Sequence, residues 1–139
     1  MSNILAFLKC CDKFTYPWGI WISTNPGTTL TQNYNEKLER VKATLGFWKF
    51  RRLSLLGKVA VPKSLVASQL VYILSPLESN YKILKEINSL FKKFLWSDKG
   101  DKIKRNVVIN DYLEGGIKMI DICPFNKSLK ATWIKKKYL

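Results

Sequence analysis

Residues 31–50 read TQNYNEKLERVKATLGFWKF, and the architecture of the chain can be worked out from this stretch. Its apolar side chains recur at alternating steps of four and three residues, which places them on one face of an α-helix. The positions that form this apolar stripe are Tyr34, Leu38, Val41, Leu45 and Trp48. The pattern therefore predicts an amphipathic helix that packs against a protein core and turns basic residues toward solvent.

Two more helical segments are predicted downstream. Ser54 is a typical N-cap for a segment from residue 55 to about residue 74. Pro62 should kink or break that segment near Val61, because proline removes a backbone hydrogen bond and clashes with the preceding turn. Residues 80–96 then carry a broad apolar face with a lysine-rich rim, formed by Ile83, Ile87, Leu90, Phe91, Phe94 and Leu95.

The two ends of the chain show weaker signals. Residues 3–14 have helical spacing, and residues 16–24 are aromatic and β-branched, as in a strand. Near the other end, residues 98–105 should be an exposed loop, and a final helix should open at Pro124. Residues 107–109 and 117–122 flank a Gly-Gly turn and should pair as a hairpin. The predicted fold is mainly α, an amphipathic helix bundle with a short N-terminal strand and a small C-terminal β-hairpin.

Composition limits the partners of the protein. The 139 residues suit one domain, and 47% are hydrophobic, which is ordinary for a globular protein. Lys and Arg number 24 against 10 Asp and Glu, a net charge of +14. The basic residues gather in segments 35–63, 81–105 and 127–139. Any one segment could equally be a solvated helix face, but three of one sign favour a polyanionic partner, with nucleic acid first and anionic membrane second.

Several classes of protein are not supported. Histidine is absent and the three cysteines lack metal-ligand spacing, which argues against a zinc site or a disulfide framework. The apolar start lacks the basic region of a signal peptide, and no apolar run has the length and flanks of a membrane span. An intracellular protein of the nucleus or cytoplasm, with no membrane span and of unknown oligomeric state, is expected.

Catalysis is poorly supported and binding is better supported. Paired carboxylates that hold two metal ions are missing; Asp98 and Asp101 are close in sequence, but they lie in a lysine-rich loop. We therefore expect no enzyme activity from the chain on its own, no metal site and no cofactor. Basic residues alternate with aromatic ones most densely around residues 48–58, and a second basic group follows near residue 102. Candidate nucleic-acid-binding residues are Lys49, Arg51, Arg52, Lys58, Lys63, Lys102, Lys104 and Arg105.

Four segments together resemble a known family. They are FRRLSLLGK at residues 50–58, the apolar run at 61–74, FLW at 94–96 and GGIKM at 115–119. In order and spacing they are similar to the thumb and following region of LINE-type (non-LTR) retrotransposon reverse transcriptases. The resemblance implies an RNA-directed DNA polymerase parent that uses Mg²⁺. It also implies that Arg51, Arg52, Lys58 and Lys63 contact a nucleic-acid backbone, while the family's [FY]-x-D-D motif is missing.

The resemblance also implies a division of the chain. Residues 1–27 would be a remnant of the palm, 28–98 a helical thumb-like region, and 99–139 a basic loop, hairpin and C-terminal helix. The expected function is a polymerase fragment that binds template-primer nucleic acid (RNA, DNA or an RNA–DNA hybrid) without catalysing synthesis. Two alternatives are an inactive, marginally folded relic and a peripheral binder of anionic membrane.

Overall fold

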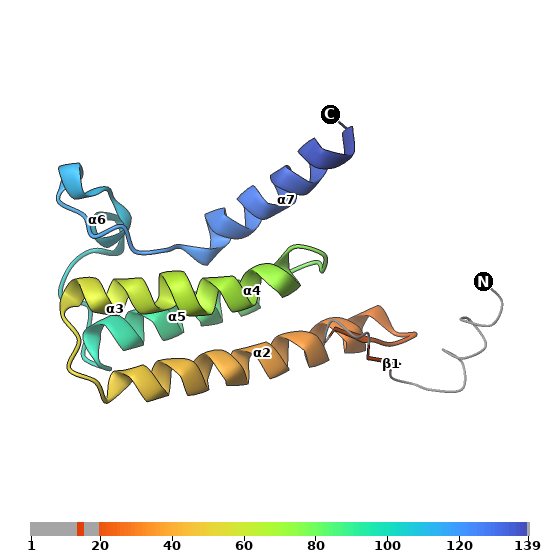
Figure 1. The fold of residues 1–139 in the computed structure, drawn as a ribbon, viewed down its shortest axis with the longest axis horizontal. Coiled ribbons are helices and arrows are strands. Elements are labelled where there is room, and N and C mark those ends of the chain that lie inside the picture. The colour runs from red at the N-terminus through yellow and green to blue at the C-terminus, as the bar shows by residue number, and fades with distance from the viewer. Residues whose placement is uncertain (1–13, 16–19, 139) are drawn as a thin grey trace.

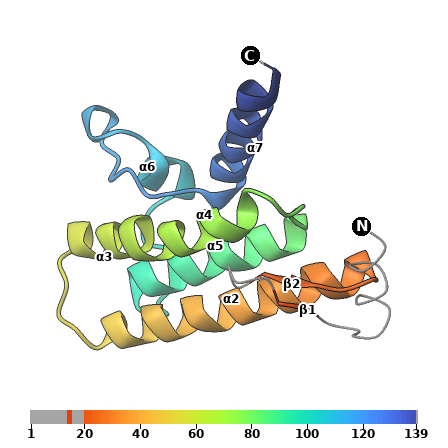
Figure 2. The ribbon, with the colours of Figure 1, turned by 45° about the vertical axis from the view of Figure 1, so that its right-hand side comes forward.

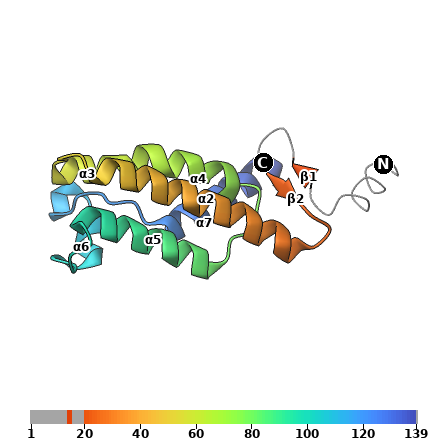
Figure 3. The same cartoon turned by 90° about the horizontal axis from the view of Figure 1, so that it is seen from below.

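The computed structural model describes residues 14–15 and 20–138. Helix α2 (Pro26–Lys49), the helical run 55–74 and helix α5 (Tyr81–Trp96) lie alongside one another (Figure 1). Contacts join α2 to α5, α2 to α4 and α3 to α5, and the same arrangement is seen from below in Figure 3. These helices form the main body of the protein, in agreement with the predicted mainly α bundle.

Helix α2 begins and packs as its sequence predicts. The Asn25 side chain accepts the Gly27 backbone N–H at 3.0 Å, and Pro26 occupies the first turn. The apolar stripe faces the core: Tyr34, Leu38, Val41 and Leu45 are buried, and Trp48 is partly buried. The 3.6-residue period has therefore identified the buried face correctly.

The run 55–74 is helical throughout but changes its hydrogen bonding at Pro62. Helix α3 (Leu55–Val61) is followed by the π-helical turn η1 (Pro62–Val66) and then by α4 (Ala67–Leu74). Because Pro62 has no N–H to donate, the α-helical pattern is interrupted as expected. The Ala67 N–H donates to the Pro62 carbonyl, and this wider turn lets the helix continue rather than end.

Helix α5 supplies the other main side of the core. Asn80 caps its start by accepting the Lys82 N–H at 3.0 Å, and Ser97 ends it in a left-handed conformation with φ of 52°. Its apolar face is buried at Leu84, Ile87, Phe91, Phe94 and Leu95. The core continues through Val108, Met119 and Ile122, so apolar residues of 28–98 and of 99–139 pack in one cluster. The division into the regions 1–27, 28–98 and 99–139 stays a prediction.

The predicted C-terminal hairpin is wrong. Residues 107–109 belong to helix α6 (Arg105–Ile109), and the 3₁₀ turn η2 (Tyr112–Glu114) follows. The Val107 and Val108 N–H groups donate to the Lys104 carbonyl, which closes a helical turn where the β-branched run had favoured a strand. The Gly115-Gly116 turn is present, but it brings residues 117–119 against the end of α6, with the Ile117 and Met119 N–H groups both donating to the Val108 carbonyl.

Two short strands precede α2. Strand β1 (Phe14–Thr15) pairs antiparallel with β2 (Trp21–Ile22). Asn33 fixes β2 on α2, because its side chain accepts the Trp21 N–H and donates to the Trp21 carbonyl, both at 2.7 Å. Of the strand expected over residues 16–24, only Trp21–Ile22 is present, as β2; residues 23–24 are not in a strand, and residues 16–19 lie outside the described residues. The helix expected over residues 3–14 lies outside the described residues, apart from Phe14, which is in β1.

Helix α7 (Ile122–Tyr138) docks on the bundle mainly through its first half, from Ile122 to Lys130. Figure 2 shows it leaving the layer of the other helices at an angle. Lys130 fastens its middle by donating to the carbonyls of Ser75 at 3.1 Å and Leu77 at 2.5 Å, and desolvation lowers the pKa of Lys130. Beyond that point Trp133 and Ile134 are exposed. Within the described residues, no helix is both long and apolar enough to cross a membrane.

Candidate functional site

Three chain segments converge at the end of the bundle where α2 stops and α3 begins. The connection from Phe50 to Ser54 turns the chain, and Ser54 caps α3 by accepting the Gly57 N–H at 3.2 Å. The end of α5 and the loop toward α6 reach the same end of the molecule (Figure 1). The Lys58 ammonium donates to the Ser97 hydroxyl at 2.8 Å, which joins α3 to the end of α5.

A cleft of about 310 Å³ opens between these segments. Its lining includes three cations from two segments: Lys58 from α3, and Lys99 and Lys102 from the loop after α5. The other lining residues are Leu53, Leu55, Leu95, Trp96 and Ser97. We call this set of residues the basic cleft. Its lining offers positive charge, a hydroxyl group and apolar surface, and none of the described residues that line it is a carboxylate.

The ion pairs near the basic cleft, among the described residues, do not involve the cations that line it. Lys49 contacts Asp98, and this hydrogen bond is the main reason why the pKa of Asp98 lies below its usual range. Lys92 pairs with Asp101 at 2.8 Å. Both loop aspartates are therefore matched to cations outside the cleft lining. Within the described part of the chain, no carboxylate forms an ion pair with Lys58, Lys99, Lys102, Arg51 or Arg52.

An aromatic cluster lies at the end of α2, just before the connection that leads to the cleft residue Leu53. The rings of Phe47 and Trp48 meet edge to face, with centroids 5.8 Å apart. The Arg51 guanidinium lies 5.0 Å from the Phe47 centroid and 5.1 Å from the Trp48 centroid. Phe50, between them in sequence, leaves 90% of its surface exposed. We call Phe47, Trp48, Phe50 and Arg51 the aromatic cluster.

The structure brings together five of the eight predicted binding residues. Lys49, Arg51 and Arg52 lie where α2 leads into the connection, and Lys58 and Lys102 line the basic cleft. The other three predicted residues do not line the basic cleft.

Lys63, Lys104 and Arg105 are placed apart from the cleft lining. Lys63 is exposed on η1, further along the helical run. Lys104 is exposed at the start of α6. Arg105 is partly buried and pairs with Asp121 at 3.0 Å, so it fastens α6 to the residue that precedes α7. The binding role of these residues stays a prediction.

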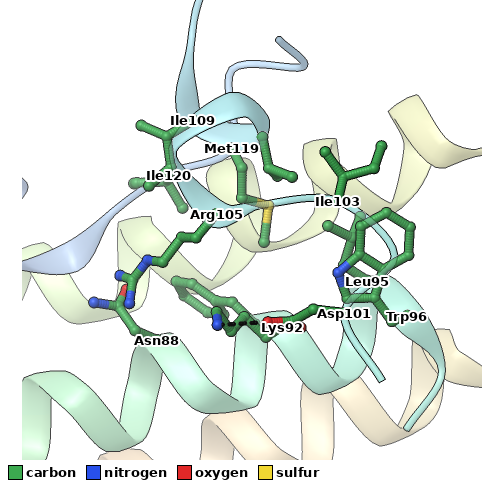
Figure 4. Close-up of a pocket in the computed structure, with 12 residues that line it drawn as sticks. Asn88, Lys92, Leu95, Trp96, Asp101, Ile103, Arg105, Ile109, Met119 and Ile120 are labelled. Atoms are coloured by element: carbon green, nitrogen blue, oxygen red, sulfur yellow. Dashed lines mark hydrogen bonds and ion pairs between the residues drawn. The ribbon is translucent and has the colours of Figure 1, made fainter. Parts of the chain in front are cut away.

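A smaller cavity lies between α5 and the segment around α6 (Figure 4). Its volume of about 20 Å³ is enough for one water molecule and too small for an organic ligand. Figure 4 shows Lys92 and Asp101 paired beside it, with Met119, Ile109 and Ile120 above α5. The cavity is therefore a packing seam that holds the loop and α6 on α5.

Sequence reasoning missed Lys99 and Trp96, which also line the basic cleft. Lys99 had a usable signal, because it lies in the same basic loop as Lys102. Trp96 had none that would separate it from the core residues of α5. Among the described residues, no group of three or more His, Cys, Asp or Glu side chains is placed to hold a metal ion.

No family model matches the chain. Over 107 residues, which cover 72% of this chain, it is 27% identical to an Arabidopsis thaliana protein described as "Putative ribonuclease H protein". The chain spans only 17% of that protein's length.

This similarity corrects the family expected from the sequence. It leads to a protein named as a ribonuclease H, so the interpretation as a LINE-type reverse transcriptase thumb, with a polymerase parent and a palm remnant, is wrong. The four segments behind it are short and consist mainly of apolar and basic residues, with a Gly-Gly pair in the last one. Such segments suit basic, core-packing helices in general, so they could not discriminate between families. The chain is thus similar, over most of its length, to part of a protein described as a ribonuclease H.

Proposed function

We propose that this chain is a non-catalytic module that binds the sugar–phosphate backbone of an RNA–DNA hybrid. The observation that carries the proposal is the basic cleft, where Lys58, Lys99 and Lys102 converge without a carboxylate in the lining. Lysines that neutralise phosphates release condensed counterions, which gives affinity that does not depend on base sequence. The hybrid is chosen because it is the nucleic acid on which a ribonuclease H acts, and the similar protein carries that name.

The arrangement of charge supports a backbone ligand. Lys58 is held by its bond to Ser97, close to where the loop that carries Lys99 and Lys102 leaves α5, so one of the three cations is positioned before a ligand arrives. The neighbouring Arg51 and Arg52 extend the positive surface along the connection. Fixed cations of one sign repel one another, and a bound phosphate chain removes that repulsion.

The absence of catalysis in the module is part of the proposal. Hydrolysis of a nucleic-acid backbone by a two-metal nuclease needs carboxylates that hold both metal ions close together. The two aspartates nearest the basic cleft, Asp98 and Asp101, are each occupied by a lysine. In this proposal another part of a longer protein would cleave the nucleic acid, and this chain would bind it.

Binding of a fluorescently labelled blunt RNA–DNA hybrid, measured by anisotropy across a salt series, tests the proposal. The test variant is Lys99→Gln with Lys102→Gln. Its matched control is Lys82→Gln with Lys85→Gln, which removes the same charge from exposed positions at the other end of α5. We expect the slope of log K against log salt to fall by about 2 in the cleft variant and to change little in the control.

Two results would overturn the proposal. Equal losses in the cleft variant and the control would mean that only net charge matters. Tighter binding to vesicles of anionic phospholipid than to the hybrid, at the same salt concentration, would assign the basic surface to a membrane instead.

A further inference from the structure

We infer that the aromatic cluster stacks on an unpaired base, so that the preferred ligand is a hybrid with a single-stranded extension. This inference rests on the proposed function, because it places the extension beside a backbone held in the basic cleft. It adds a second contact of different chemistry, which the cleft lysines cannot supply.

Phe50 is the surface that a base would meet. It leaves 90% of its area exposed at the C-terminal end of α2, although a phenylalanine normally contributes to a core. The outer side of its neighbours is already occupied, since the Arg51 guanidinium lies against the Phe47 and Trp48 rings. Phe47 is 59% exposed but carries this guanidinium over its ring, so Phe50 is the more open ring of the cluster.

The other members of the cluster, which neighbour Phe50 in sequence, are packed against one another. Trp48 packs against the core, and Phe47 meets it edge to face. Arg51, the residue after Phe50, is held over both rings, so its cation is ordered within the cluster. A planar ring next to an ordered guanidinium is the combination that single-strand-binding proteins use for a base and its phosphate.

The cluster and the basic cleft are parts of one surface. Leu53, three residues after Phe50, lines the cleft. Lys49, one residue before Phe50, contacts Asp98, which follows the cleft residue Ser97. A backbone that leaves the cleft can therefore reach Phe50 within a short extension.

The surrounding charge selects the occupant of the exposed ring. An apolar patch that binds a protein core or a second copy of this chain is usually depleted of charge at its centre. Here Phe50 is flanked by Lys49, Arg51 and Arg52, and this chain has a net charge of +14, so a second copy would be repelled. A ligand that carries both flat apolar faces and negative charge fits better, and a single-stranded nucleic acid has both.

The test compares three hybrids: one blunt, one with an extension of about six nucleotides, and one with an extension of the same length that lacks bases. Because the two extended ligands carry equal charge, their difference isolates the contribution of the bases. The variant is Phe50→Ala, with Phe50→Trp as a rescue that restores an aromatic ring. Leu113→Ala is the matched control, because Leu113 is 97% exposed on η2 and neither lines the cleft nor belongs to the cluster.

We expect the wild-type protein to bind the extension with bases about tenfold more tightly than the abasic one. Phe50→Ala should abolish that preference and leave the salt slope on the blunt hybrid unchanged, while Phe50→Trp restores it. A 2-aminopurine at the first unpaired position should be quenched by the wild-type protein and not by Phe50→Ala.

The inference is overturned if Phe50→Ala keeps the preference for bases, or if the wild-type protein shows none, while blunt hybrid is still bound with a steep salt slope. It is also overturned if the chain self-associates and Phe50→Ala abolishes that association. Loss of all binding to the blunt hybrid is a different result, since it removes the proposed function together with the inference.

Discussion

Replacing Asn88 by alanine should weaken the attachment of α7 to the bundle. Asn88 is 4% exposed, and its side-chain oxygen accepts the buried Ile122 N–H at 3.1 Å. Its amide group donates to the Asp121 carboxylate at 2.9 Å. An unpaired buried N–H costs about 1–3 kcal/mol, and the lost bond to a partly buried carboxylate adds about 1 kcal/mol. Asn88→Ala should therefore lower the free energy of unfolding by about 2–4 kcal/mol.

Urea denaturation followed by circular dichroism measures this change, with Ser89→Ala as the control because Ser89 is the exposed neighbour on the same helix. Hydrogen exchange at the Ile122 amide should accelerate in the variant, since that group loses its acceptor. A difference between the two variants below about 0.5 kcal/mol would refute the reasoning, because it would mean that the buried N–H finds another partner at little cost.

Two further predictions concern burial and close approach. Burial, reinforced by the nearby Glu78, raises the pKa of Tyr34 to about 12. Because the folded-state pKa lies above that of a free tyrosine, the stability that the protonated side chain contributes should be fully present below about pH 10 and should be lost as pH rises from about 10 to 12. Denaturation at several pH values measures this loss, and the Tyr34→Phe variant should not show it. Gly116→Ala should destabilise by about 3 kcal/mol, because a Cβ there would lie 2.0 Å from the Asn110 carbonyl oxygen. Gly100→Ala, with nothing within 4 Å of its Cβ, should change the melting temperature little, and equal melting temperatures for the two would contradict the argument.

Much of the main body was predictable because it depends on local pattern. The stripe from Tyr34 to Leu45 has a strict helical period, and packing follows from that period whichever partner helix is present. The region around α6 was not predictable for the opposite reason. Residues 107–109 have strand propensity, but Val108 is buried in the core and its carbonyl accepts two N–H groups from residues 117–119. Tertiary contacts there override the local preference.

The basic residues of the candidate site could be predicted from the sequence, but which of them lie together in the folded chain could not. Lys58 and Lys102 stood out by charge alone, but they meet only because α5 carries the chain back to the end of α3. The same folding removes Arg105 from the cleft and commits it to Asp121. Charge patterning reports which side chains are available, and only chain topology decides which of them share a ligand.

The ion pairs of Asp98 and Asp101 determine how much positive charge remains uncompensated at the basic cleft. A chain under selection for stability alone could place Asp98 and Asp101 against the cleft lysines, since both aspartates lie in the same loop as Lys99. Instead they pair with Lys49 and Lys92, on the helices that border the loop. Surface pairs of this kind contribute little stability, so the pairing matters mainly for where it leaves charge uncompensated. It fixes the loop and keeps positive charge concentrated at the cleft, which is the arrangement that a phosphate backbone requires.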